Sequence, residues 1–167
     1  VTGDVMGMLG TVINSLALGD AIEQKGVPVK VYTSVPMPTV ADTFTARDAN
    51  QSLADGFVVV CAGGTGNPFF TTDTAGALKA IELRCDVLLK GTKVDGVYSE
   101  DPKKNPSAKR YETISHDEVI ARDLRVMDTA DFALARDNGL PIIVYALDDG
   151  EGLMGVLAGR TKSTRVG

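Results

Sequence analysis

The sequence is poor in the residues that build metal centres and disulfides. It has two cysteines, Cys61 and Cys85, and one histidine, His116, among 167 residues. This set makes no standard zinc shell and supports no Ser-His-Asp arrangement. Since both cysteines lie in apolar, strand-like runs, we interpret them as buried free thiols of a reducing cytoplasm. His116 lies within a helix-capping sequence, which predicts a surface position.

Positive charge and long apolar segments are also scarce. Lysine and arginine number 17 against 22 acidic residues, a net charge of −5, which argues against a nucleic-acid or anionic-membrane surface. No apolar run approaches the roughly 20 residues that span a bilayer. No signal peptide pattern opens the chain. The sequence therefore predicts neither a nucleic-acid nor a membrane partner.

Two common nucleotide-binding motifs are missing as well. The dinucleotide fingerprint fails because Gly64 and Gly66 are followed by Phe69 where a third glycine is needed. No G-x-x-x-x-G-K-[ST] sequence occurs, which excludes a P-loop.

The residues that are present predict one α/β domain over 1–167. With 44% hydrophobic residues, the chain can bury a core. Buried strands alternate with helices, so we expect a three-layer αβα fold with a mostly parallel sheet. The predicted strands are 27–35, 57–62, 86–90 and 141–147, and the predicted helices are 5–24, 41–54, 71–83, 115–124, 129–138 and 152–158.

A first candidate loop, residues 62–73, follows the strand 57–62. Its glycines allow a ligand to approach the backbone, and Thr65 and Asn67 supply hydrogen bonds. Thr71 and Thr72 lie where a helix start offers free N–H groups to an anion. The alternative is an ordinary tight turn followed by a helix cap.

A second candidate loop, residues 91–102, follows the strand 86–90. Lys93 can neutralise a phosphate, Tyr98 can lie on a flat base, and Asp101 can accept from ribose hydroxyls or hold Mg²⁺ through water. The alternative is a solvated surface loop.

Both loops resemble those of the bacterial uridylate (UMP) kinases, members of the amino acid kinase superfamily. The matching segments are AGGTGNPFFTTDTA (62–75) and LLKGTKVDGVYSEDP (88–102). GDVMGMLGTVIN (3–14) and RVMDTADFALARDNGLPIIVY (125–145) resemble further segments of the same family. The resemblance therefore runs through essentially the whole chain.

The resemblance implies transfer of the ATP γ-phosphoryl group to UMP, with Mg²⁺ as the cofactor. It implies that Asp73 is the active-site aspartate. It implies that UMP is bound by Asp4, Thr65, Gly66, Asn67, Pro68, Phe69, Phe70, Thr71 and Thr72. It implies that ATP is bound by Thr92, Lys93, Tyr98 and Asp101. It also implies a cytoplasmic homohexamer that responds to the effectors GTP and UTP.

The chain departs from the family pattern in its phosphate-handling residues. A K-[LI]-S-G-E strand with its lysine, and a G-G-G-N turn followed by an arginine, are absent from the 167 residues. Because the chain opens at Val1 with no initiator Met, we interpret it as a UMP kinase that lacks its N-terminal part. We therefore expect no meaningful phosphoryl transfer by this chain alone.

Two other functions are compatible with part of this pattern. A superfamily kinase for carbamate, glutamate or aspartate would lack the GTGNPFF sequence. A non-catalytic nucleotide-binding or storage subunit would fit the missing lysine and glycine turn, but it predicts no preference for uracil.

Overall fold

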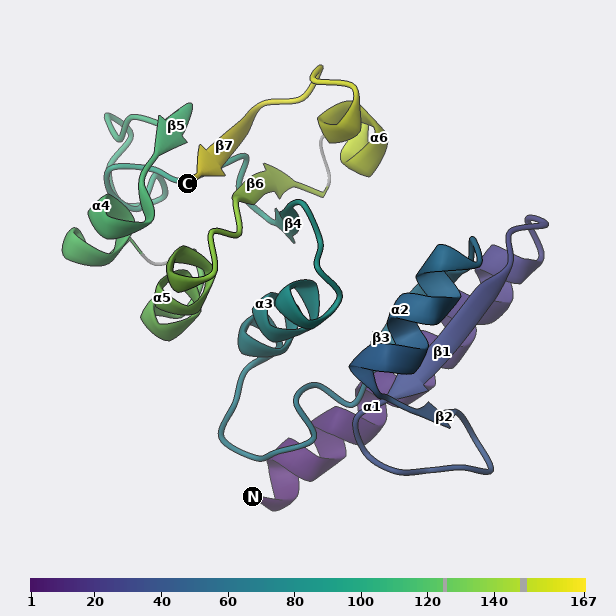
Figure 1. Ribbon diagram of the computed structural model, residues 1–167. Coiled ribbons are helices and arrows are strands. Elements are labelled where there is room, and N and C mark those ends of the chain that lie inside the picture. Colours follow the sequence, from purple (N-terminus) through teal and green to yellow (C-terminus); the bar gives the residue numbers. More distant parts are fainter. Residues whose placement is uncertain (125, 148–149) are drawn as a thin grey trace. The chain divides into compact units, whose positions relative to one another are not determined.

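The computed structural model describes residues 1–124, 126–147 and 150–167, and the chain divides into two compact units (Figure 1). The N-terminal unit is Val1–Leu83 and the C-terminal unit is Arg84–Gly167. Arg125, the first residue of the family-like segment 125–145, lies outside the described residues.

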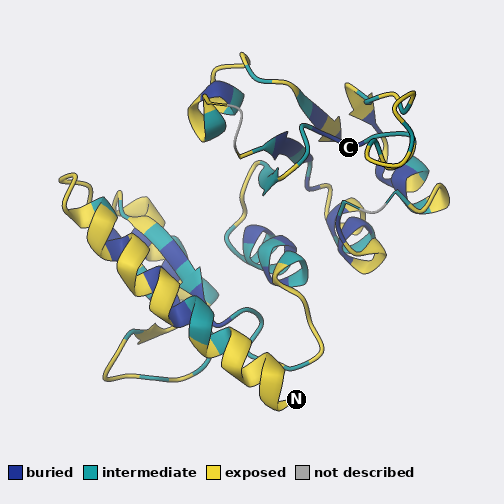
Figure 2. Ribbon diagram, turned by 180° about the vertical axis from the view of Figure 1, so that it is seen from behind, coloured by how far each residue is buried: buried dark blue, intermediate teal, exposed yellow. Residues whose placement is uncertain are grey.

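The N-terminal unit holds a parallel sheet of three strands. Its order is β2 (Asp42–Thr43), β1 (Val29–Thr33) and β3 (Val58–Ala62). Helices α1 (Thr2–Glu23) and α2 (Ala46–Ala54) cover opposite faces of this sheet (Figures 1 and 2). Helix α3 (Thr72–Glu82) follows β3. This is the expected layering of helix, parallel sheet and helix.

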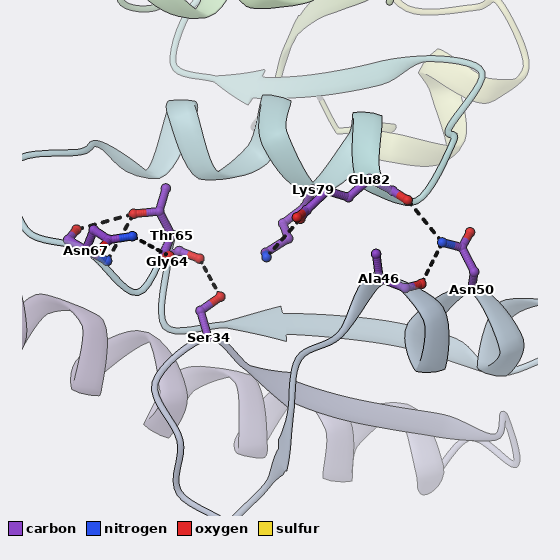
Figure 3. Close-up of polar contacts among 8 residues, drawn as sticks. All are labelled: Ser34, Ala46, Asn50, Gly64, Thr65, Asn67, Lys79 and Glu82. Atoms are coloured by element: carbon purple, nitrogen blue, oxygen red, sulfur yellow. Dashed lines mark hydrogen bonds and ion pairs between the residues drawn. The ribbon is translucent and has the colours of Figure 1, made fainter.

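Polar contacts fix α2 and α3 within this unit. Thr45 begins α2, because its hydroxyl accepts from the N–H of Asp48 at 3.1 Å. The predicted helix 41–54 is therefore too long at its start, where Asp42–Thr43 forms β2 instead. The side chain of Asn50 in α2 donates to the carbonyl oxygen of Glu82 in α3 at 3.0 Å (Figure 3).

Helix α1 packs along the sheet through a narrow face of small residues. Gly19 is buried, and a side chain there would meet Val31 at 2.9 Å. The opposite face is apolar and exposed, as at Met6 and Ile13. By length and composition α1 could cross a membrane, a test that core helices and signal sequences also pass. The expectation that no segment is long and apolar enough was therefore wrong for α1.

The C-terminal unit holds a mixed sheet of four strands. Its order is β4 (Leu88–Thr92), β6 (Ile142–Ala146), β7 (Ser163–Val166) and β5 (Thr113–Ile114). Only β6 and β7 pair antiparallel among these strands in the described part of the chain. Helices α4 (His116–Ala121) and α5 (Thr129–Asp137) pack against each other, and α6 (Gly152–Leu157) precedes β7.

Several sequence expectations need correction in this unit. His116 is buried rather than at the surface, with 8% of the side chain exposed. Ser115 does cap α4, accepting from Glu118 at 3.1 Å, but the first residue of that helix turns inward. Cys85 is exposed because it precedes β4 rather than lying within it, and Cys61 is half-buried; both are free thiols.

Strands β3 and β4 are less buried than their apolar sequences predict. Each is the outermost strand of its sheet. Val58 at the start of β3 keeps 40% of its surface exposed, and every residue of β4 is half-buried. The expectation of strands buried on both faces was wrong for the structure described.

Candidate functional site

Loop 63–71 joins the end of β3 to the start of α3 and depends on its glycines. Gly63, Gly64 and Gly66 all have positive φ angles, between 57° and 78°. A Cβ atom at Gly63 would lie 3.1 Å from the backbone nitrogen of Ser34, and one at Gly66 would lie 2.9 Å from the carbonyl oxygen of Ser34. Only glycine fits these positions without a shift of the backbone.

The loop is also held by hydrogen bonds from neighbouring elements. The hydroxyl of Ser34, just after β1, donates to the carbonyl oxygen of Gly64 at 2.9 Å (Figure 3). The N–H of Gly63 donates to the hydroxyl of Thr11 in α1 at 2.9 Å. The loop is therefore attached to both the sheet and α1.

Thr65 and Asn67 face each other across the tip of the loop (Figure 3). The N–H of Asn67 donates to the Thr65 hydroxyl at 3.2 Å, and the Asn67 amide donates to the Thr65 carbonyl oxygen at 3.2 Å. The two residues are thus brought together, and Asn67 is exposed.

The two phenylalanines after Pro68 are exposed, with 80% of Phe69 and 59% of Phe70 accessible. Phe69 has a φ of 70°, which is rare for a bulky residue. Its N–H donates to the carboxylate of Asp4 in α1 at 3.4 Å. Asp4 therefore contacts the loop. Strained backbone of this kind is concentrated at ligand sites.

The loop ends at the first turn of α3. Thr71 caps the helix, accepting from Thr74 at 3.3 Å. Thr72 is exposed beside it, and Asp73 lies half-buried in the same turn. The N–H groups of a first turn lack partners within the helix and attract anions.

The second candidate loop leads into a hairpin in the C-terminal unit, residues 97–111, which is closed by backbone hydrogen bonds. The Thr92 hydroxyl accepts from Val94 at 2.8 Å, which turns the chain at the end of β4. Tyr98 then pairs with Arg110 across the hairpin. Lys93 is exposed at this turn.

A cavity of about 610 Å³ lies against this hairpin. Of the four residues assigned to ATP, Tyr98 and Asp101 line this cavity, whereas Thr92 and Lys93 are not among its described lining residues. Asp101 orders the rim, because its carboxylate accepts from the N–H of Lys103 at 2.9 Å.

The cavity also gathers three cations that the sequence analysis missed: Lys103, Lys104 and Arg122. Arg122 is oriented by Tyr111, whose hydroxyl accepts from it at 2.8 Å, and by Glu118 at 2.6 Å. The lysine pair directly after the Asp-Pro turn is the sequence signal that was overlooked. The same lining holds the carboxylates of Glu100, Asp101 and Asp123, so the cavity presents both signs of charge.

The comparisons with known proteins identify the family of the chain. Residues 1–146 match the amino acid kinase family. The chain belongs to this family, and its αβα fold is that of the family's solved structures.

Individual relatives of the chain narrow the match within this family to the uridylate (UMP) kinases. The chain is 53% identical over 166 residues to the uridylate kinase of Brucella anthropi, covering 99% of this chain and 69% of the relative. It is 54% identical to that of Mesorhizobium japonicum, with the same coverage. The UMP kinase structure from Ureaplasma parvum matches with a TM-score of 0.94 at 34% identity, covering 98% of this chain and 70% of that one. The UMP kinase structure from Bacillus anthracis matches with a TM-score of 0.93 at 38% identity, covering 99% of this chain and 69% of that one. The family resemblance seen in the sequence is confirmed.

Proposed function

We propose that this chain carries the nucleotide-recognising residues of a UMP kinase, the enzyme that transfers the ATP γ-phosphoryl group to UMP. The observation that carries the proposal is the 53% identity to a uridylate kinase over 166 residues. The kinases of carbamate, glutamate and aspartate are disfavoured by the same observation, because the GTGNPFF sequence lies inside the matched region.

In this proposal loop 63–71 binds UMP, the phosphoryl acceptor. Thr65 and Asn67, with hydroxyl and amide groups at the loop tip, read the uracil. The remaining wall of the UMP site is formed by Gly66, Pro68, Phe69 and Phe70. The Asp4 carboxylate accepts a hydrogen bond from a ribose hydroxyl of UMP. Thr71 and Thr72 direct the UMP phosphate to the start of α3, where the helix N–H groups stabilise an anion.

The cavity beside Tyr98 and Asp101 binds the donor, ATP. The Tyr98 ring lies against the base, and Lys103, Lys104 and Arg122 offset the charge of the phosphates. Thr92 and Lys93 lie near the end of β4, where the sequence resemblance also assigns ATP.

Phosphoryl transfer between two such anions needs positioning and positive charge more than a strong base, because the acceptor oxygen is already ionised. Asp73 organises the cationic groups around the transferring phosphoryl group. Mg²⁺ supplies charge neutralisation when bound. Mg²⁺ sites of this kind commonly combine one or two carboxylates with the substrate phosphates.

We further propose that this chain alone binds nucleotides without turning them over. The lysine of K-[LI]-S-G-E and the G-G-G-N turn with its arginine are not in the sequence, and those groups would face the transferring phosphoryl group. The second candidate is a non-catalytic nucleotide-binding or storage subunit, but the presence of both nucleoside loops, with Asp73 and Asp101, favours an enzyme. We also propose that residues 1–167 act as a single functional domain. In this proposal the protein is a cytoplasmic homohexamer, and GTP and UTP control its activity as effectors.

Calorimetric titration of the purified chain with UMP, CMP and AMP, followed by a coupled assay for ADP, tests these proposals. We expect UMP to bind more tightly than CMP or AMP, and no turnover. Equal binding of all three would support the storage alternative, since a loop that hydrogen-bonds one base rejects a base with the wrong donors. Turnover at rates ordinary for kinases would overturn the proposed inactivity.

A further inference from the structure

The hydroxyl of Thr11 occupies a fixed place between α1 and loop 63–71. It donates to the carbonyl oxygen of Met8, one turn earlier in α1, at 2.7 Å. It accepts from the N–H of Gly63 at 2.9 Å. Because its single hydrogen is used toward Met8, the oxygen lone pairs are directed to Gly63. The direction of this contact is therefore set by the helix.

Gly63 is the residue where the loop leaves the sheet. It is buried and has a φ of 76°, with the backbone of Ser34 close on one side. A buried N–H without a partner is costly, so the loop has a strong preference for the path that reaches Thr11. Small changes at Gly63 move every residue that follows it, Thr65 and Asn67 included.

The same helix meets the loop a second time. Asp4, in the first turn of α1, accepts from the N–H of Phe69 at 3.4 Å. Thr11 and Asp4 thus hold the two ends of the loop along one rigid element. A helix fixes the separation of its residues at 1.5 Å per residue, so α1 sets the span of the loop.

We propose that Thr11 is a positioning residue for the UMP site: through the Gly63 N–H it sets the path of loop 63–71, and so the placement of the groups that read the uracil. This inference rests on the proposed binding of UMP to that loop. In this proposal Thr11 itself does not contact the nucleotide.

The expected effect on affinity follows from the population of the competent loop. When only a fraction of the protein holds the binding conformation, the apparent Kd rises by the inverse of that fraction. Loss of one hydrogen bond of ordinary strength shifts such a population by about two- to tenfold. We therefore expect a UMP Kd raised by about two- to tenfold when the Thr11 hydroxyl is removed.

The test compares Thr11→Val, which keeps the side-chain shape without the hydroxyl, with Thr11→Ser, which keeps the hydroxyl. Thr43→Val, at an exposed strand position of the same unit, is the matched control. UMP and ATP are titrated separately into each variant. We expect weaker UMP binding by Thr11→Val alone, with Thr11→Ser and Thr43→Val close to the unaltered chain. ATP affinity should stay constant in all three, because the donor cavity lies in the other unit.

Other results would overturn the proposal. A folded Thr11→Val chain with unchanged UMP affinity would remove the positioning role. A parallel loss of UMP and ATP affinity would show that Thr11 stabilises the fold as a whole and does not position the UMP loop. If the unaltered chain binds ATP but no UMP, the assignment of the loop to UMP fails, and this inference fails with it.

A second measurement needs no variant and covers the case in which Thr11→Val does not fold. Hydrogen exchange of the Gly63 amide is followed in the unaltered chain with and without UMP. A loop held by Thr11 in its binding conformation should exchange more slowly when UMP is bound. Unchanged exchange at saturating UMP would contradict the proposal.

Discussion

The hydroxyl of Tyr98 donates a hydrogen bond of 2.6 Å to the carboxylate of Asp95, three residues earlier. The other Asp95 oxygen lies 3.9 Å from the guanidinium of Arg110, which donates to the carbonyl oxygen of Ser163 at the start of β7. An aromatic side chain on the wall of the cavity is thereby linked to the sheet.

The first prediction concerns the ionisation of this phenol. The hydrogen bond to Asp95 raises the pKa of Tyr98 above its ordinary value of 10, because the carboxylate stabilises the protonated phenol. Asp95→Asn should return this pKa toward 10, and alkaline difference absorbance of the chain's four tyrosines measures it. Asp137→Asn, which breaks an exposed pair with Arg136, is the control and should leave the curve unchanged. An identical curve for Asp95→Asn would contradict the assignment.

The second prediction compares two glycines with the same backbone angle. Gly66 and Gly26 both have a φ of 78°. At Gly26 a side chain meets nothing within 4 Å, whereas at Gly66 it lies 2.9 Å from the Ser34 carbonyl oxygen. Gly26→Ala should cost about 1–2 kcal/mol in unfolding free energy, the cost of the left-handed conformation.

Gly66→Ala should cost more than Gly26→Ala and should also weaken UMP binding, because the backbone of Ser34 must shift. Urea unfolding and UMP titration of both variants measure the difference. Equal losses of stability and equal UMP affinities would show that the close approach to Ser34 has no consequence.

The third prediction separates recognition of UMP from chemistry. Thr65→Ala should weaken UMP binding by this chain, while Asp73→Asn should leave it nearly unchanged. In an enzyme of this family with its phosphate-handling residues complete, Asp73→Asn should lower kcat far more than it weakens UMP binding, because its role lies in the transition state. The reverse pattern would mean that the two roles had been exchanged. Thr43→Ala serves as the control for the binding measurement.

The fourth prediction follows from the burial of His116. Burial lowers the pKa of His116 below its ordinary value of 6.5, since the charged ring is poorly solvated. Nε2 has no hydrogen-bond partner among the described residues. A hydrogen bond with the backbone of Leu140 and the charge of Asp117 oppose the lowering of this pKa, and the charge of Arg136 adds to it. The unfolded chain therefore takes up a proton at a higher pH than the folded chain.

The stability contributed by neutral His116 is complete above pH 6.5 and should decline as the pH falls through the lowered pKa. Urea unfolding between about pH 7 and pH 5 measures this decline. His116→Gln should flatten it in that interval. A slope unchanged by the substitution would assign the pH dependence to the carboxylates instead.

Much of the fold could be predicted from local patterns. Apolar β-branched runs correctly located β1, β3, β4 and β6, and Thr71 and Ser115 marked the starts of α3 and α4. These features depend on residues close together in the sequence. Strands β2 and β5 have two residues each and carry no periodic signal. Strand β7 alternates buried and exposed side chains, a pattern the sequence analysis passed over.

Features that depend on distant residues were harder to predict. His116 is buried because Gly167, near the end of β7, leaves room for its ring. The cations of the cavity come from separate segments, since Arg122 follows α4 and Lys103 lies in the hairpin. The positive φ of Phe69 has no local signal at all, because the sequence offers a bulky residue where a glycine would be expected.

Strands β3 and β4 each lie at one edge of the sheet to which they belong. Each strand is mostly apolar and has a neighbouring strand on one side only in its sheet as described. Neither strand carries the proline that commonly protects such an edge, and the single charge between them is Lys90. Such edges are templates for addition of strands from other molecules, which leads to aggregation. We therefore expect that a strand from another molecule that adds to either sheet adds at β3 or β4, and that charged substitutions on these strands raise the concentration at which the chain stays soluble.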